Sequence, residues 1–412
     1  MATSQSSLIT LLFVSFGFVL PALPKLVSSI GINYGQVANN LPSPENVVPL
    51  VQSIGVKKVK LYDSDPRVLR AFANTGVEFI VGIRNECLDK MQDESNAVAW
   101  VKENVQCYLP ATKITTITVG NEILTGNNAD MMENLLPAMQ NIHAALISLG
   151  LDKQVGVTTT HSLAVLQTSY PPSGGAFRPD LREYISPILS FHSKTGSPFL
   201  INAYPFFAYK ANPKQVSLDF VLFQPNQGIV DSASNLHYDN MLHAQIDAVY
   251  AALARLGYGK LPVHISETGW PSKGDEDEAG ATPDNARKYN GNLMKLLSQS
   301  QKKGTPMRPD LDLDVYVFAL FNENLKPGPT SERNYGLFKP DGTPAYQLAA
   351  SNGKESSAAG SGGGGGVAIT PSPGDSSTSG FFNISSATGS LRCDRAIFFL
   401  GLLFLFLNLA SH

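Results

Sequence analysis

The sequence predicts an α/β protein of the (β/α)8 TIM-barrel class, folded as a single domain over residues 30–350. Short runs rich in Val, Ile and Thr recur along this region, and an amphipathic segment or a long loop follows each of them. This alternation favours parallel strands joined by crossover helices, and eight such units are the number that closes a barrel. An open doubly wound sheet is the alternative architecture, but no dinucleotide-binding glycine fingerprint supports it.

The predicted strands have β-branched or aromatic residues at their centres, as residues of a buried parallel sheet do. In chain order they are residues 29–35 (SIGINYG), 57–63 (KKVKLYD), 78–83 (EFIVGI), 114–122 (ITTITVGNE), 154–162 (QVGVTTTHS), 199–206 (FLINAYPF), 263–270 (VHISETGW) and 315–324 (VYVFALFNEN). The longest irregular insertion, residues 207–240, follows the sixth run and is rich in aromatic residues. We expect a small subdomain there, with its aromatic side chains either buried or in contact with a ligand.

The N-terminus carries a processing signal that is not part of the fold. Residues 8–23 are almost uninterruptedly apolar, are too few to span a membrane comfortably, and are followed by the small residues Ser28 and Ser29. Residues 1–29 are therefore interpreted as a signal peptide for secretion. Residues 351–386 are rich in Ser and Gly, a composition typical of a flexible stalk.

The C-terminus has the layout of a glycosylphosphatidylinositol attachment signal. A polar spacer separates the small residues Ser385 and Ser386 from the apolar run 396–410, and only Ser411 and His412 follow that run. We expect residues 387–412 to be removed and the lipid to be attached at Ser385 or Ser386, on the outer face of the plasma membrane. A transmembrane anchor is the alternative, but the run is shorter than the roughly 20 residues that cross the hydrocarbon core.

Composition indicates the class of binding partner and the state of the cysteines. The net charge of −3, without a dense Lys/Arg cluster, lacks the electrostatic pattern of a nucleic-acid-binding protein and fits a neutral, polar polymer better. Cys393 lies in the C-terminal signal, and a predicted helix holds Cys87 and Cys107 farther apart than the roughly 7 Å limit for a disulfide, so we expect two separate buried thiols. The single sequon predicts glycosylation of Asn383 in the stalk.

Acidic residues end three of the predicted strands. Glu122 ends the fourth, Glu267 lies near the end of the seventh, and Glu323 lies near the end of the eighth. Because strands four and seven lie on opposite sides of a barrel, their side chains can converge at its C-terminal mouth, where two carboxyls could flank one glycosidic bond. For any one glutamate a salt bridge or a capping role is the commoner outcome, but three at strand ends favour an active site.

Four motifs carry a resemblance to a known family. They are VGNE ending at Glu122, SETGWPS around Glu267, FNENLK with Glu323 and Lys326, and the opening IGINYG. From about Ile30 to Gln347 the chain resembles the plant glucan endo-1,3-beta-glucosidases of glycoside hydrolase family 17. The resemblance implies endo-hydrolysis of β-1,3-glucan with retention of configuration, with callose-like cell-wall polysaccharide as the partner.

The resemblance also implies roles for individual residues. Glu122 would be the proton donor and then the base, and Glu267 the nucleophile, while Glu323, Lys326 and Glu332 would form a supporting charged group. No metal and no cofactor are implied. Consistently, the histidines lack metal-ligand spacing, residues 310–314 lack the glycine and glutamate of a calcium loop, and the acidic residues 275–278 are predicted to form an exposed loop without a function.

Polar and aromatic residues near strand ends are candidates for contact with sugar rings. A ring face can stack on the apolar face of a sugar, and a hydroxyl can orient the nucleophile. The alternative for each of them is core packing with a satisfied polar group. The candidate substrate-binding residues are Tyr34, Tyr62, Asn121, Tyr204, Phe207 and Trp270.

Two other functions stay open at the level of sequence. A transglycosylase would use a sugar hydroxyl in place of water on the same glycosyl-enzyme. A lipid-anchored glucan-binding protein would keep the fold without turnover, although intact Glu122 and Glu267 count against it. We expect a monomer in each case.

Overall fold

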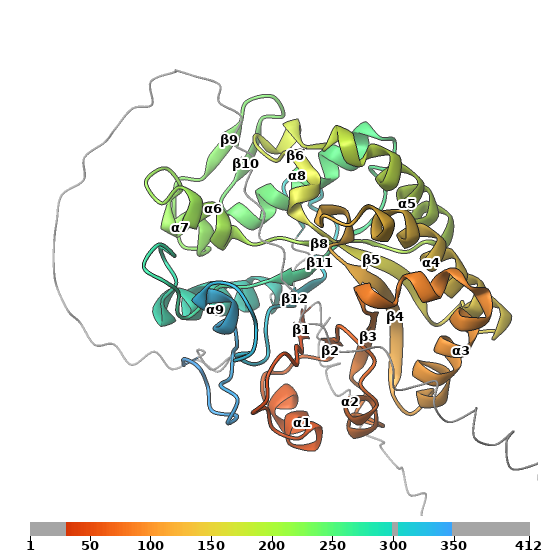
Figure 1. Cartoon of the computed structure of the whole chain (residues 1–412). Coiled ribbons are helices and arrows are strands. Elements are labelled where there is room, and N and C mark those ends of the chain that lie inside the picture. Colours follow the sequence, from red (N-terminus) through yellow and green to blue (C-terminus); the bar gives the residue numbers. More distant parts are fainter. Residues whose placement is uncertain (1–29, 299–303, 348–412) are drawn as a thin grey trace, which may run out of the picture.

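The computed structural model describes residues 30–298 and 304–347, and these form a closed barrel of parallel strands (Figure 1). Around the barrel the order is β1-β12-β11-β8-β5-β4-β3-β2. The predicted barrel is thus confirmed, and the open-sheet alternative is wrong. The barrel strands are β1 (Ile30–Asn33), β2 (Lys58–Lys60), β3 (Glu78–Ile83), β4 (Lys113–Asn121), β5 (Gly156–Ser162), β8 (Phe199–Asn202), β11 (Val263–Thr268) and β12 (Val315–Val317).

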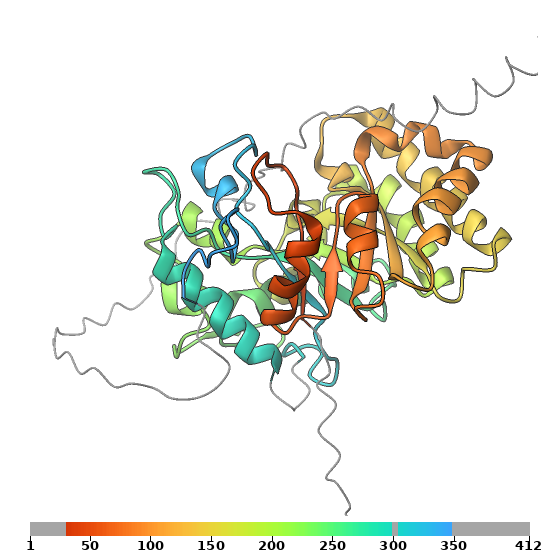
Figure 2. The ribbon, with the colours of Figure 1, turned by 90° about the horizontal axis from the view of Figure 1, so that it is seen from below.

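Helices surround the strands, as Figures 1 and 2 show from two directions. Polar side chains start several of them, as when Asn128 accepts a hydrogen bond from the Met131 backbone at the start of α4. The helices are α1 (Pro44–Ser53), α2 (Pro66–Ala71), α3 (Glu94–Asn104), α4 (Ala129–Ser148), α5 (Arg182–Thr195), α6 (Pro205–Ala211), α7 (Leu218–Val221), α8 (Met241–Arg255) and α9 (Pro283–Ser298). Among the described residues, none of these helices combines the length and the apolar character needed to cross a bilayer.

Several strands are shorter than predicted, and for β8 and β12 the chain visibly takes up other structure or other partners where the strand ends. Strand β8 ends at Asn202, since Pro205 takes the first turn of α6. Strand β12 ends at Val317, after which the backbone of Ala319 bonds to Tyr335. After β12, the only helix in the described residues 318–347 is the short 3-10 helix η8 (Thr330–Arg333), so the eighth unit has no α-helix there.

Two hairpins are added to the barrel on one side (Figure 1). The first, β6 (Leu166–Thr168) with β7 (Ala176–Phe177), interrupts the connection from β5 to α5 and was not predicted. The second, β9 (Ile229–Asp231) with β10 (Leu236–Tyr238), lies in the predicted insertion after β8, where Phe220 and Tyr238 are buried in a small cluster of their own. The expectation of a subdomain with buried aromatic side chains therefore holds for these two residues.

The remaining expectations about the body have mixed outcomes. Cys87 and Cys107 are not joined to each other, as expected, but Cys107 is exposed rather than buried. Asp314 pairs with Lys58 at 2.6 Å at the start of the barrel. The proposed signal peptide, stalk, sequon and lipid-attachment residues lie outside the described residues.

Candidate active site

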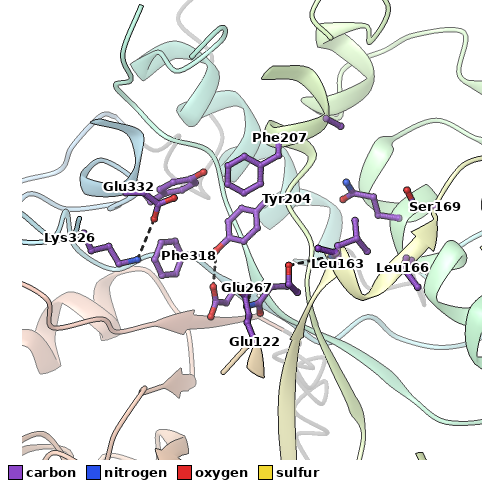
Figure 3. Close-up of a pocket in the computed structure, with 16 residues that line it drawn as sticks. Glu122, Leu163, Leu166, Ser169, Tyr204, Phe207, Glu267, Phe318, Lys326 and Glu332 are labelled. Carbon is purple, nitrogen blue, oxygen red and sulfur yellow. Dashed lines mark hydrogen bonds and ion pairs between the residues drawn. The ribbon is translucent and has the colours of Figure 1, made fainter. Parts of the chain in front are cut away.

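Glu122 and Glu267 lie at the C-terminal ends of β4 and β11 and line one pocket at the mouth of the barrel (Figure 3). The parallel strands put both carboxyls at the same end of the barrel, as the rule for (β/α)8 folds requires. Figure 3 shows the pocket extending from Lys326 and Glu332 at one end, past the two glutamates, toward Leu163 at the other.

Three donors surround the carboxyl of Glu267. Its Oε1 accepts hydrogen bonds from Lys60 Nζ at 2.9 Å and from the Tyr62 hydroxyl at 2.7 Å, and its Oε2 accepts one from the Tyr204 hydroxyl at 2.9 Å. Burial alone would raise the pKa of Glu267, but the charge of Lys60 and the bonds from Lys60 and Tyr62 outweigh burial and hold the pKa below its usual value. Glu267 is therefore ionised at neutral pH.

Glu122 has a different environment. Its Oε1 accepts one hydrogen bond, from Asn202 Nδ2 at 2.8 Å. Burial, reinforced by the negative charge of Glu267, raises the pKa of Glu122 to about 7, although the Asn202 bond opposes the shift. The backbone of Glu122 is in the left-handed region at φ 56°, which ends β4 and begins a short 3-10 helix. Glu122 can therefore hold or release a proton near neutral pH.

A second charged group stands at one end of the pocket. Lys326 Nζ lies 3.8 Å from Glu323 Oε2 and 3.8 Å from Glu332 Oε2, and it stands 4.2 Å from the centre of the Phe318 ring. Glu323 is buried and also accepts a hydrogen bond from the backbone of Val37 at 2.8 Å. Lys326 and Glu332 line the pocket. Glu323 does not line it, but pairs with Lys326.

Comparison with known proteins places this arrangement in a family. The sequence profile of glycosyl hydrolases family 17 matches residues 30–350. The chain belongs to glycosyl hydrolases family 17. It is 64% identical over 339 residues to glucan endo-1,3-beta-glucosidase 11 of Arabidopsis thaliana, covering 82% of this chain and 79% of the relative. It is also 62% identical over 355 residues to glucan endo-1,3-beta-glucosidase 10 of the same plant, covering 86% and 83%.

A solved structure shares the fold of this family 17 chain. It is a beta-1,3-glucanase and pollen allergen of Cryptomeria japonica, with a TM-score of 0.74 and 40% sequence identity. The match covers 78% of this chain and 99% of that protein. In the part of the family 17 chain that the structure describes, no group of three or more His, Cys, Asp or Glu side chains is arranged to hold a metal ion.

Five of the six candidate substrate-binding residues fall into two groups. Tyr204 and Phe207 line the pocket, and Tyr62 reaches Glu267, so these three lie at the site. Tyr34 packs against Phe321 in the core, and Trp270 is fully buried with its Nε1 donating to the Gly280 carbonyl at 2.8 Å. The expectation that Tyr34 and Trp270 touch substrate is corrected, because no sugar ring can reach a buried face.

Asn121 is half-buried beside the site. Its backbone N–H donates to Asn85 Oδ1 at 2.7 Å, and its carbonyl accepts from Asn85 Nδ2 at 3.0 Å. This pair of bonds fixes the residue immediately before Glu122. Asn121 is not among the residues that line the pocket.

Two residues that contact the glutamates, Lys60 and Asn202, are not among those predicted from the sequence. Lys60 lies two positions before Tyr62, and in a strand this spacing puts both side chains on one face. A lysine at that spacing in a buried strand was the signal that could have found it. Asn202 ends the apolar run of β8. Polar residues at the ends of apolar strands are candidates for the site, and this rule, which selected Glu122, applies equally to Asn202.

In the acidic loop after β11, residues 275–277 are exposed as predicted, but Glu278 is not. Glu278 is buried rather than exposed, and its Oε1 accepts from Lys210 Nζ at 2.9 Å and from the Ser331 hydroxyl at 2.5 Å. It thereby joins α6 to η8, the two segments that carry Phe207 and Glu332. In this family 17 chain the loop is a clamp beside the pocket.

Proposed function

We propose that this protein hydrolyses internal β-1,3-glucosidic bonds of β-1,3-glucan with retention of configuration. The observation that carries the proposal is the pair of carboxyls in one pocket, those of Glu122 and Glu267, whose pKa values are shifted in opposite directions. Such a pair provides one ionised nucleophile and one protonated acid at the same pH, which is what a retaining glycosidase requires. Membership of family 17 and the names of the relatives support the substrate class.

In the first step, an oxygen of the Glu267 carboxylate attacks the anomeric carbon and forms a covalent glycosyl-enzyme. Glu122 gives its proton to the glycosidic oxygen, so the leaving chain departs as an alcohol. Lys60, Tyr62 and Tyr204 keep Glu267 ionised and fix both of its oxygens before the reaction. Once the proton has left, the negative charge passes from Glu267 to Glu122.

In the second step, Glu122 acts as the base. It removes a proton from a water molecule, the water oxygen attacks the anomeric carbon, and the bond to Glu267 breaks. Two inversions leave the product with the original β-configuration. The bond from Asn202 stabilises the carboxylate form of Glu122 that this step needs.

The test is hydrolysis of purified linear β-1,3-glucan, with products sized over time and their anomers determined by NMR. Mid-length products that are first formed as the β-anomer, and that are lost in Glu267→Gln, are expected. Products longer than the substrate would instead establish a transglycosylase. No turnover on several β-glucans would leave only a glucan-binding role.

We propose further that the protein acts at the cell surface as a monomer. The apolar N-terminal run, the Ser/Gly-rich segment and the C-terminal layout support secretion, a stalk, and a glycosylphosphatidylinositol anchor at Ser385 or Ser386 on the outer face of the plasma membrane, facing the cell wall. Phosphatidylinositol-specific phospholipase C should release the protein from intact cells that express the full chain. Replacing both serines with Leu should abolish the releasable pool, and a protein that stays bound after lipase treatment would contradict the anchor.

A further inference from the structure

Glu278 is a buried carboxylate outside the pocket, and the proposed mechanism does not use it. Its side chain is fully buried, and it is not among the residues that line the pocket. Burial would raise its pKa, but hydrogen bonds from Ser331 and Lys210 outweigh burial and hold the pKa below its usual value. A negative charge is therefore held inside the protein, where it is stable only with its donors in place.

The donors to Glu278 come from three segments of the chain. Its Oε1 accepts hydrogen bonds from Lys210 Nζ of α6 at 2.9 Å and from the Ser331 hydroxyl of η8 at 2.5 Å. Its Oε2 accepts bonds from the backbone N–H of Ser331 at 2.9 Å and from that of Asp275, in its own loop, at 3.0 Å. Each oxygen thus accepts two bonds, and Ser331 is held by both oxygens.

The loop that carries this carboxylate is itself fixed. The Gly280 carbonyl accepts hydrogen bonds from Trp270 Nε1 at 2.8 Å and from Asn285 Nδ2 at 2.9 Å. The carboxylate of Asp275 accepts bonds from the backbone N–H of Thr330, at 2.9 Å, and from its hydroxyl. The start of η8 is therefore bound to this loop at two successive residues.

The helix η8 in turn holds the ion pair at one end of the pocket. Glu332 directly follows Ser331, and it pairs with Lys326 (Figure 3). Arg333, the last residue of η8, donates from Nη1 to the carbonyls of Lys326 at 3.1 Å and of Gly328 at 2.9 Å. A displacement of η8 would consequently move both charges of the pair.

The charges of this pair act on the two glutamates of the pocket. Burial raises the pKa of Glu267, Lys60 lowers it most, and Lys326 lowers it further. Burial and the charge of Glu267 raise the pKa of Glu122, and Glu332 raises it further. The pair thus widens the difference between the two pKa values. The charged groups that act on Glu332 itself are Lys326, Glu267, Glu278 and Glu323.

We propose that Glu278 is a positioning residue for the hydrolysis, which holds the ion pair of Lys326 and Glu332 in its place in the pocket. This inference rests on the proposed function. Glu278 acts through Ser331, since it does not line the pocket itself. The role requires a carboxylate, because an amide at this position would present its NH2 group to two of the four donors.

The test is the pH profile of kcat/KM for Glu278→Gln on a linear β-1,3-glucan hexasaccharide, measured on the full chain. We expect the maximum to fall about 10-fold and the profile to narrow from both sides. The acidic limb should move upward because Lys326 is no longer held near Glu267, and the alkaline limb downward because Glu332 is no longer held near Glu122. Each shift should be less than about 1 unit.

Two matched variants isolate the path through η8. Glu276→Gln, at an exposed position of the same loop, should change neither the height nor the width of the profile. Lys210→Met removes the bond to α6 and leaves both bonds to Ser331, so the profile should keep its width. An equal narrowing in Lys210→Met would overturn the path through Ser331.

The other results decide against the positioning role. A lower maximum with both limbs in place would mean that Glu278 only supports the fold. A downward shift of both limbs together would mean that Glu278 acts through its own charge, because removing a negative charge lowers the pKa of both carboxyls. If Glu278→Gln does not fold, Ser331→Ala, which keeps the backbone bond, should show the same narrowing to a smaller extent. Wild-type protein inactive on the hexasaccharide would contradict the proposed function itself.

Discussion

Glu267 is buried and Glu122 half-buried in one pocket, and their surroundings differ in the number and charge of the donors that reach them. Glu267 accepts three hydrogen bonds, one from a buried lysine, while Glu122 accepts one from a neutral amide. Burial raises the pKa of either carboxyl, so the partners decide which one stays ionised. The division of chemical roles thus lies in the neighbours of the two glutamates.

The largest expected effect comes from removing the ionised member of the pair. Glu267→Gln should lower kcat on linear β-1,3-glucan by about 10⁴-fold or more, because the amide cannot form the glycosyl-enzyme. Glu276→Gln, the same change on the exposed loop after β11, is the control and should keep full activity. Substantial turnover by Glu267→Gln would remove Glu267 from the role of nucleophile.

Protein stability should respond to the two glutamates in opposite directions. Glu267→Gln leaves the buried Lys60 without its counter-charge and should lower the free energy of unfolding at neutral pH by about 3–5 kcal/mol. The charge of Glu267 stabilises the fold above the ordinary carboxyl pKa, and this contribution is lost as pH falls through its lowered folded value.

Glu122→Gln should do the reverse. Because the pKa of Glu122 rises to about 7 on folding, wild-type protein loses stability between the ordinary carboxyl pKa of 4.5 and pH 7, and the neutral amide avoids this loss. The variant should exceed wild type by about 1–3 kcal/mol at pH 8 and match it at pH 4. Denaturant unfolding of both variants at the two pH values measures the contrast, which equal losses in both variants would refute.

Lys60→Met tests the cation that distinguishes the two environments. Without Lys60 the pKa of Glu267 rises, so the acidic limb of the kcat/KM profile should move to higher pH by about 1–3 units. Lys58→Met is the control on the same strand, since Lys58 pairs with Asp314 at the start of the barrel. An acidic limb that stays in place in Lys60→Met would mean that the hydroxyls of Tyr62 and Tyr204 keep Glu267 ionised without the cation.

The smallest change in the pH profile of kcat/KM is expected for Asn202→Leu. Its amide favours the ionised form of Glu122, so its loss raises the pKa of Glu122 further and should move the alkaline limb of the profile upward by less than about 1 unit. The acidic limb, set by Glu267, should move less. A downward shift of the alkaline limb would contradict the assigned direction.

Much of this site could be predicted from strand ends, and the failures have physical reasons. A residue at a strand end can point outward as well as inward, which is why Trp270 lies buried while Tyr204 lines the pocket. The clamp at Glu278 was not visible because its partners Lys210 and Ser331 lie 68 and 53 residues away in sequence. The fold could be predicted more fully than the site. Eight apolar runs repeat a local pattern in the sequence, whereas the pKa of a side chain depends on contacts between distant segments.

The most direct test of the two roles is the anomer formed when azide rescues each glutamate removed to glycine, with an aryl β-laminaribioside as substrate. In Glu267→Gly, azide should attack the anomeric carbon once and yield the α-glycosyl azide. In Glu122→Gly, azide should attack the glycosyl-enzyme and yield the β-glycosyl azide. The opposite pair of anomers would contradict the assignment of Glu267 as nucleophile and Glu122 as proton donor.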